Sequence, residues 1–195
     1  MKQPAPLAFW KQSKFNSCGP AVMMTALHEL GMPGLSEKRE MEIWKHVKHP
    51  MSLGSLPAKM AMYAASLGVD VKLLRKNISP PDIKVFWKTP RKTLHKSLLK
   101  TYYETALKAE FQGLPTEFYE DEREILDRLL KDSGLRVIYL IVDDDGVLHF
   151  VMAREKDGRI AIMDPYYGRN TLFDIPDFIN RLSPNMVGYA ILLKV

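Results

Sequence analysis

The chain has 195 residues, of which 46% are hydrophobic and 26% are charged. This composition supplies enough apolar material for one hydrophobic core and is short for two, so we expect a single domain over residues 1–195. No apolar run reaches the 18 or so residues that a membrane span requires. The first residues also lack the apolar segment and cleavage site of a secretory signal, which favours a cytoplasmic protein.

Charge and cysteine content narrow the function classes further. Much of the net charge of +5 lies in a basic stretch over 84–100 that has no zinc-finger spacing and no basic helix-turn-helix pattern, so direct nucleic-acid binding is disfavoured. That stretch is predicted to be a solvated helix face or, alternatively, a lid or docking surface for an acidic partner. Cys18 is the single cysteine, which excludes an internal disulfide and a thiolate zinc cluster, and we expect no metal and no organic cofactor.

The first two thirds of the chain predict mainly helices. Apolar residues recur at helical spacing after Cys18 until Gly31 stops the pattern, and Ser36 is a suitable cap for a second helix. In chain order, the predicted elements are helices over 18–30, 35–47 and 55–68, a strand over 69–76, a mostly helical basic insertion over about 78–119, and a helix over 120–134.

The last third changes to β-branched and apolar runs separated by turn residues. The Asp157-Gly158 pair between two of these runs is typical of a tight hairpin turn. Helices followed by such runs predict an α+β fold, with N-terminal helices packed on a C-terminal antiparallel β-sheet. The predicted strands are 136–142, 149–156, 159–165 and 188–195.

Cys18 stands at the first turn of a predicted helix, in the run NSCGPA. A thiol in that position faces unpaired backbone N–H groups and the positive end of the helix dipole, and both stabilise the thiolate. Its own backbone N–H would point to where the negative oxygen of a tetrahedral intermediate forms. A lone cysteine is most often a small buried side chain, so this residue by itself leaves both interpretations open.

A catalytic thiolate needs a histidine base and a group that orients the base. Of the five histidines, His149 is the one that begins a predicted strand directly after an acidic turn, and Asp164 ends the next strand. The predicted hairpin would bring these two side chains together. Gln12, six residues before Cys18, is a candidate second oxyanion donor through its amide. Taken singly, a strand histidine, an Asp-Pro turn and an exposed glutamine are all ordinary structural features.

Together, the glutamine, the run NSCGPA with its apolar helix, and the later run HFVMAREKDGRIAIMDPYYG resemble the bacteriocin-processing cysteine peptidases, which act after a double-glycine leader. The resemblance covers about 9–74 and 124–195 and omits about 78–119. It implies a papain-like fold in which Cys18 is the nucleophile, His149 the general base and acid, Asp164 its orienting residue and Gln12 an oxyanion-hole side chain. Family members often have aspartate where this chain has Ser17.

These features predict a cysteine peptidase-like hydrolase that cleaves a peptide or isopeptide bond through a thioester acyl-enzyme. Two alternatives use the same residues: an acyltransferase or transpeptidase, and a catalytically inert peptide-binding module. The Cys-His-Asp triad does not separate hydrolysis from acyl transfer. The expected partner is a peptide or protein substrate, with an acidic partner at 84–100 as a further option.

Overall fold

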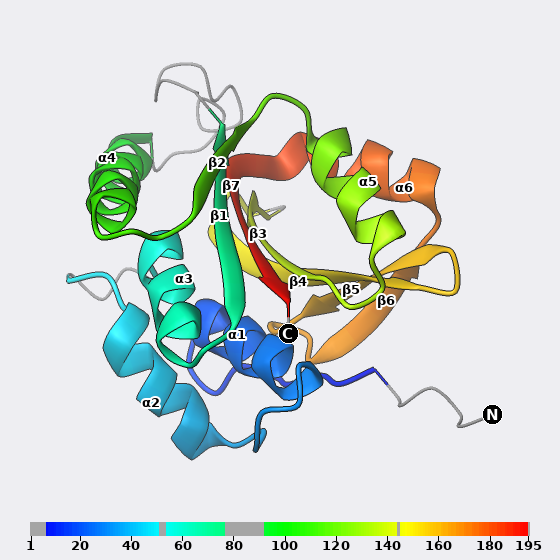
Figure 1. The fold of residues 1–195 in the computed structure, drawn as a ribbon, viewed down its shortest axis with the longest axis horizontal. Helices are drawn as coiled ribbons and strands as arrows, with labels where there is room; N and C mark the ends of the chain where they lie inside the picture. Colours follow the sequence, from blue (N-terminus) through cyan, green and yellow to red (C-terminus); the bar gives the residue numbers. More distant parts are fainter. Residues whose placement is uncertain (1–6, 51–53, 77–91, 144, 195) are drawn as a thin grey trace.

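Within residues 7–50, 54–76, 92–143 and 145–194, which the computed structural model describes, a seven-stranded sheet has helices on both faces (Figure 1). The elements in chain order are α1 (Cys18–Glu29), α2 (Glu37–Val47), α3 (Pro57–Ser66), β1 (Asp70–Lys76), α4 (Lys92–Phe111), β2 (Thr116–Tyr119), α5 (Glu122–Lys131), β3 (Arg136–Val142), β4 (Leu148–Lys156), β5 (Arg159–Asp164), β6 (Arg169–Phe173), α6 (Ile175–Arg181), a short 3-10 helix (Ser183–Asn185) and β7 (Met186–Lys194). The predicted α+β fold is confirmed.

The strands of the sheet follow the order β2-β1-β7-β3-β4-β5-β6. Neighbouring strands are antiparallel, as predicted for the last third of the chain, except that β1 and β2 run parallel. The prediction of a mostly helical segment up to residue 119 is wrong at its end, because residues 116–119 pair with β1 as a strand. β6 was not predicted either, since the sequence RNTLF is polar and mostly exposed and is held by pairing with β5.

Helices cover the two faces of the sheet in separate groups, and each group encloses its own apolar core. Helices α1 to α4 lie on one side, and α5 and α6 lie on the other (Figure 1). Helix α1 is buried without interruption from Cys18 to Leu27, as expected of a helix enclosed on all sides. The first core includes Met23, Ile43, Met60, Leu99 and Met152. The second includes Ile125, Leu129, Val137, Tyr139 and Phe178.

The hairpin that joins β4 to β5 has the predicted turn. Asp157 and Gly158 have φ angles of 53° and 75°. Two consecutive residues with positive φ are what a two-residue type I′ hairpin turn requires. Lys156 pairs with Arg159 across the turn, and the ladder runs on to the pair Met152 and Met163. The hairpin therefore fixes the end of β5 relative to the start of β4.

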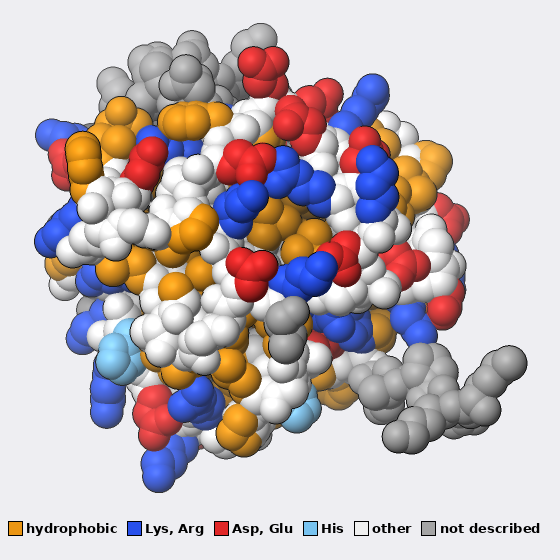
Figure 2. Space-filling view, viewed as in Figure 1, with side chains coloured by type: hydrophobic (Ala, Val, Ile, Leu, Met, Phe, Trp, Pro, Cys, Tyr) orange, Lys and Arg blue, Asp and Glu red, His pale blue; other side chains and the backbone are white. Residues whose placement is uncertain are grey.

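Helix α4 confirms the helical prediction for residues 92–111. Residues 84–91 of the basic stretch 84–100 lie outside the described residues, and the role of the stretch as an acidic-partner surface stays a prediction. On the face shown in Figure 2, Lys and Arg side chains are interspersed with Asp and Glu side chains. Among the ion pairs of the described residues, Lys72 lies 2.8 Å from Glu117 and Lys194 lies 2.6 Å from Asp132. None of the helices in the described ranges is long and apolar enough to cross a membrane.

Candidate active site

Cys18 is the first residue of α1 and is 6% exposed. The residue before it, Ser17, occupies the N-cap position but makes no side-chain cap. The next residue, Gly19, lies against the chain at Ser55, where an added Cβ would stand 2.4 Å from Ser55 Oγ. A glycine is required here because any side chain would push α1 away from the segment leading into α3. The thiol is thus fixed at the end of a tightly packed helix.

His149 and Asp164 come together at the open end of the β4–β5 hairpin, as predicted. The ring nitrogen Nε2 of His149 lies 2.9 Å from Asp164 Oδ1. This nitrogen is the donor, because a carboxylate oxygen can only accept, and the second ring nitrogen is left for another partner. The side chain of Cys18 interacts with the ring and is the candidate for that partner. Asp164 is itself held by its own turn, because Oδ1 also accepts the backbone N–H of Tyr166 at 2.9 Å.

The charges of this group of side chains support one another. Burial alone would lower the pKa of His149, but hydrogen bonds to Asp164 and Cys18 and the negative charges on both raise it from 6.5 to about 10. Burial would likewise raise the pKa of Asp164, but the hydrogen bond and positive charge of His149, with backbone N–H groups, lower it overall. The arrangement therefore favours the protonated ring of His149 beside the ionised carboxylate of Asp164.

The segment before Cys18 is attached to the turn that follows Asp164. The backbone N–H of Gln12 donates to the carbonyl of Pro165 at 2.8 Å. Three positions further along that turn, Gly168 packs so closely on Lys11 that a Cβ would lie 2.5 Å from Lys11 Cβ. The N-terminal segment and the hairpin, more than 150 residues apart in the sequence, therefore meet at the predicted site.

Gln12 lies in this segment, but its amide is bonded within its own loop. Its Nε2 group donates to the carbonyls of Lys14 and Phe15 at 2.9 Å and 2.8 Å. Its Oε1 atom is buried without a hydrogen-bond partner in the described part of the chain. For Gln12 to serve as an oxyanion donor, one of these N–H groups must turn to the substrate, so that role stays a prediction.

Two further residues near the site were not predicted. Glu40 of α2 is fully buried and accepts hydrogen bonds from the segment that precedes Cys18. A signal was present, since Glu40 lies on the same helix face as the buried Ile43 and Val47. Tyr102 of α4 is buried near the thiol. Burial raises its pKa, and the negative charge on Cys18 adds to this effect.

No protein-family model matches the sequence, and no curated protein matches it. Among solved structures, the peptidase domain of Streptococcus ComA, a bifunctional ABC transporter involved in a quorum-sensing pathway, matches with a TM-score of 0.54. The match covers 97% of this chain and 98% of that domain, at 14% sequence identity. The chain has a papain-like peptidase-domain fold. This confirms the predicted fold, and at such low identity the likeness concerns the fold alone.

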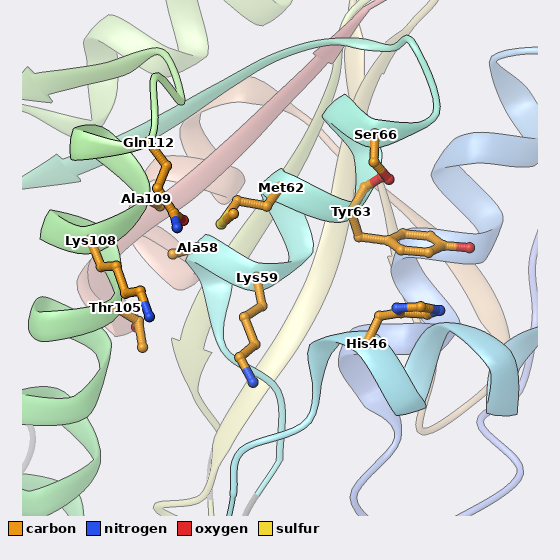
Figure 3. A pocket seen from close by; sticks show the side chains of 10 residues that line it. All are labelled: His46, Ala58, Lys59, Met62, Tyr63, Ser66, Thr105, Lys108, Ala109 and Gln112. Carbon is orange, nitrogen blue, oxygen red and sulfur yellow. The ribbon is translucent and has the colours of Figure 1, made fainter.

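The structure also has a hollow of about 410 Å³, which lies apart from the four predicted site residues. Figure 3 shows side chains of α3 facing α4 across it, with the ring of His46 beside that of Tyr63 at its border. Lys59 and Lys108 add two cationic side chains to its otherwise mainly apolar wall. Within the described ranges, no group of three or more His, Cys, Asp or Glu side chains is arranged to hold a metal ion.

Proposed function

We propose that this protein is a cysteine peptidase-like hydrolase that cleaves a peptide or isopeptide bond through a thioester acyl-enzyme. The observation that carries the proposal is the hydrogen bond of His149 to Asp164 across the hairpin, with the ring close enough to Cys18, at a helix N-terminus, for the two side chains to interact. A thiol, an imidazole and a carboxylate in that order are the groups that nucleophilic acyl transfer requires.

In the acylation step, the Cys18 thiolate attacks the carbonyl carbon of the scissile bond. The carbonyl electrons move to oxygen, and the resulting tetrahedral intermediate then breaks the C–N bond. The His149 imidazolium gives its proton to the leaving amine, which departs neutral. The raised pKa of His149, to about 10, suits it to hold this proton at neutral pH until the amine leaves.

In the deacylation step, neutral His149 takes a proton from water, and the hydroxide attacks the thioester carbon. The C–S bond breaks, the acid is released, and Cys18 and His149 return as thiolate and imidazolium. Asp164 accepts the Nε2–H bond throughout, so the ring presents its other nitrogen to the thiol and the substrate. A carboxylate in this position also stabilises the positive charge that the ring carries.

The developing oxyanion needs preorganised donors. The backbone N–H of Cys18 at the start of α1 is the first candidate, since Ser17 does not cap that turn with its side chain. Gln12 is the second candidate, and its attachment to Pro165 supports its placement beside the hairpin. In this proposal, binding of the substrate carbonyl replaces one of the two loop carbonyls as the partner of the Gln12 amide.

The proposal is tested with p-nitrophenyl acetate, a generic acyl donor that needs no knowledge of the natural substrate. The wild type should release one nitrophenolate per chain in a rapid burst, with an acetyl group on Cys18 in peptide mass spectra. Cys18→Ala should show neither, while its circular dichroism and thermal unfolding stay those of the wild type. A burst of equal size in Cys18→Ala would rule the proposal out.

The fate of the acyl group then separates hydrolysis from transfer. With glycinamide added, a hydrolase releases mainly acetate, whereas an acyltransferase forms N-acetylglycinamide in preference to acetate. Predominant amide formation would contradict the hydrolase assignment and leave the nucleophile assignment intact.

A further inference from the structure

A buried carboxylate lies beneath the segment that leads to Cys18. Glu40 of α2 is 0% exposed, and its Oε2 accepts the indole Nε1–H of Trp10 at 2.8 Å. Its Oε1 accepts the backbone N–H of Ser13 at 3.0 Å and the hydroxyl of Ser17 at 2.5 Å. All three donors are neutral groups of the same short segment. Burying a carboxylate costs free energy unless hydrogen bonds compensate it. Loss of any of these three donors is therefore expected to be costly.

These three bonds restrain both ends and the middle of residues 10–17. Gln12 lies between the first two contact points, and Ser17 directly precedes Cys18. The opposite side of the segment is held by the bond from Gln12 to the Pro165 carbonyl. The segment is thus fixed between a carboxylate from the helical side and a carbonyl from the hairpin turn beside Asp164.

The bond to Glu40 also determines what Ser17 does. A serine at an N-cap normally uses its oxygen to accept an N–H of the first helical turn. Here the Ser17 hydroxyl donates to Glu40, its oxygen accepts the backbone N–H of Lys14 at 3.1 Å, and no side-chain cap forms. The backbone N–H groups at the start of α1 are therefore kept from a competing side-chain acceptor, at the place where an oxyanion would bind.

We propose that Glu40 is a positioning residue for acyl transfer: it fixes residues 10–17 so that the oxyanion donors face the carbonyl attacked by Cys18. This inference rests on the proposed thiol chemistry and adds a residue to it. Glu40 does not contact the reacting atoms. It acts through the backbone and the side chains of the segment that it holds.

An amide is a poor replacement for this carboxylate. Glu40→Gln keeps the size of the side chain but replaces one acceptor oxygen with an NH₂ group, which would face the N–H of Trp10 or Ser13. Two opposed donors repel, so the segment must shift. Trp10→Phe is the milder change, because it removes one donor and leaves the carboxylate and its other two bonds in place.

The test compares two reactions of the same thiol. Acetylation by p-nitrophenyl acetate forms a C–S bond, expels nitrophenolate and passes through an oxyanion. Alkylation by iodoacetamide is a direct displacement of iodide and needs no oxyanion donor. The ratio of the acetylation rate constant to the alkylation rate constant therefore measures how well the site stabilises the oxyanion. Changes in thiol reactivity or in the fraction of folded protein affect both rate constants and cancel in the ratio.

Glu40→Gln should lower this ratio at least tenfold, since loss of one oxyanion donor costs about 10²–10³ in rate. Trp10→Phe should lower it about threefold. The matched control is Glu42→Gln, on the same helix, whose carboxylate pairs with Arg39 near the surface at 3.7 Å. That variant should keep the wild-type ratio.

A Glu40→Gln ratio within twofold of the wild type would overturn the proposal, whether both rates fall together or neither falls. If Glu40→Gln does not fold, Trp10→Phe decides by the same criterion, with no change in ratio as the contrary result. Failure of the proposed chemistry looks different, because the wild-type thiol itself would then react with both reagents no faster than free cysteine.

Discussion

The two halves of the proposed site are held in different ways. His149 and Asp164 belong to one hairpin, whose register is fixed by backbone hydrogen bonds and by a two-residue turn. The segment before Cys18 has no such ladder and depends on a few side-chain contacts, above all those of Glu40. We call the pair His149 and Asp164 the hairpin half and residues 10–17 the oxyanion half. We infer that the hairpin half tolerates sequence change along its strands, whereas the oxyanion half is sensitive to single substitutions far from it in the sequence.

The largest effect is expected in the hairpin half, at Asp164. Asp164→Ala removes the acceptor that orients the ring of His149 and should lower acylation by about 10²–10⁴. Asp164→Asn keeps an acceptor oxygen but loses the charge, so its rate should fall less than tenfold. Its activity should also be lost at a lower pH on the alkaline side, because the pKa of His149 is raised partly by that charge. Steady-state pH profiles of both variants measure this, and equal losses in the two would contradict it.

In the oxyanion half, Gln12→Ala should lower the rate of acylation by p-nitrophenyl acetate by a factor of about 10². The rate of alkylation by iodoacetamide should stay within twofold of the wild-type rate. The reason is that the Gln12 amide is needed only where an oxyanion forms. Gln112→Ala, in the hollow between α3 and α4, is the control. If Gln12→Ala keeps its acylation rate, the amide acts only within its own loop, through its bonds to Lys14 and Phe15.

A smaller effect is expected where α1 meets the chain at Ser55. Gly19→Ala places a Cβ 2.4 Å from Ser55 Oγ, and relieving this overlap should cost about 1–3 kcal/mol of unfolding free energy. Ser55→Gly in the same chain should restore much of the loss, because it removes the clashing atoms. Urea denaturation of the single and double variants measures both terms, and purely additive losses would show that the close approach is not the cause.

The pH dependence of stability tests the charge state of the hairpin histidine. A pKa raised in the folded state means that His149 contributes fully to stability below about pH 6.5 and that this contribution is lost as pH rises towards 10. The difference in unfolding free energy between wild type and His149→Gln should therefore shrink across that window. His28→Gln, at an exposed position of α1, is the control. A difference that stays constant from pH 6 to pH 10 would contradict the proposed ion pairing.

The hairpin half could be predicted from the sequence because its determinants are local. Asp157 and Gly158 define the turn, and the strand lengths then bring Asp164 to His149. The helix that begins at Cys18 was likewise readable from apolar spacing and from Gly31.

The oxyanion half could not be predicted in the same way, because its contacts join distant residues. Nothing near Trp10 or Ser17 in the sequence points to Glu40, and the attachment of Gln12 to Pro165 depends on how the whole sheet folds. Strands β2 and β6 escaped prediction for a related reason. Both are short, carry polar residues and are stabilised by pairing with a neighbouring strand rather than by an apolar pattern of their own.

The most direct test of the central claim, that His149 turns Cys18 into a nucleophile, is the rate of alkylation by iodoacetamide at pH 7. Because the chain has one cysteine, a single adduct mass reports the reaction. The wild type should react at least about tenfold faster than free cysteine, and His149→Ala should fall to the rate of an unpaired thiol. A wild type that reacts no faster than free cysteine, or a His149→Ala variant that reacts as fast as the wild type, would contradict the claim.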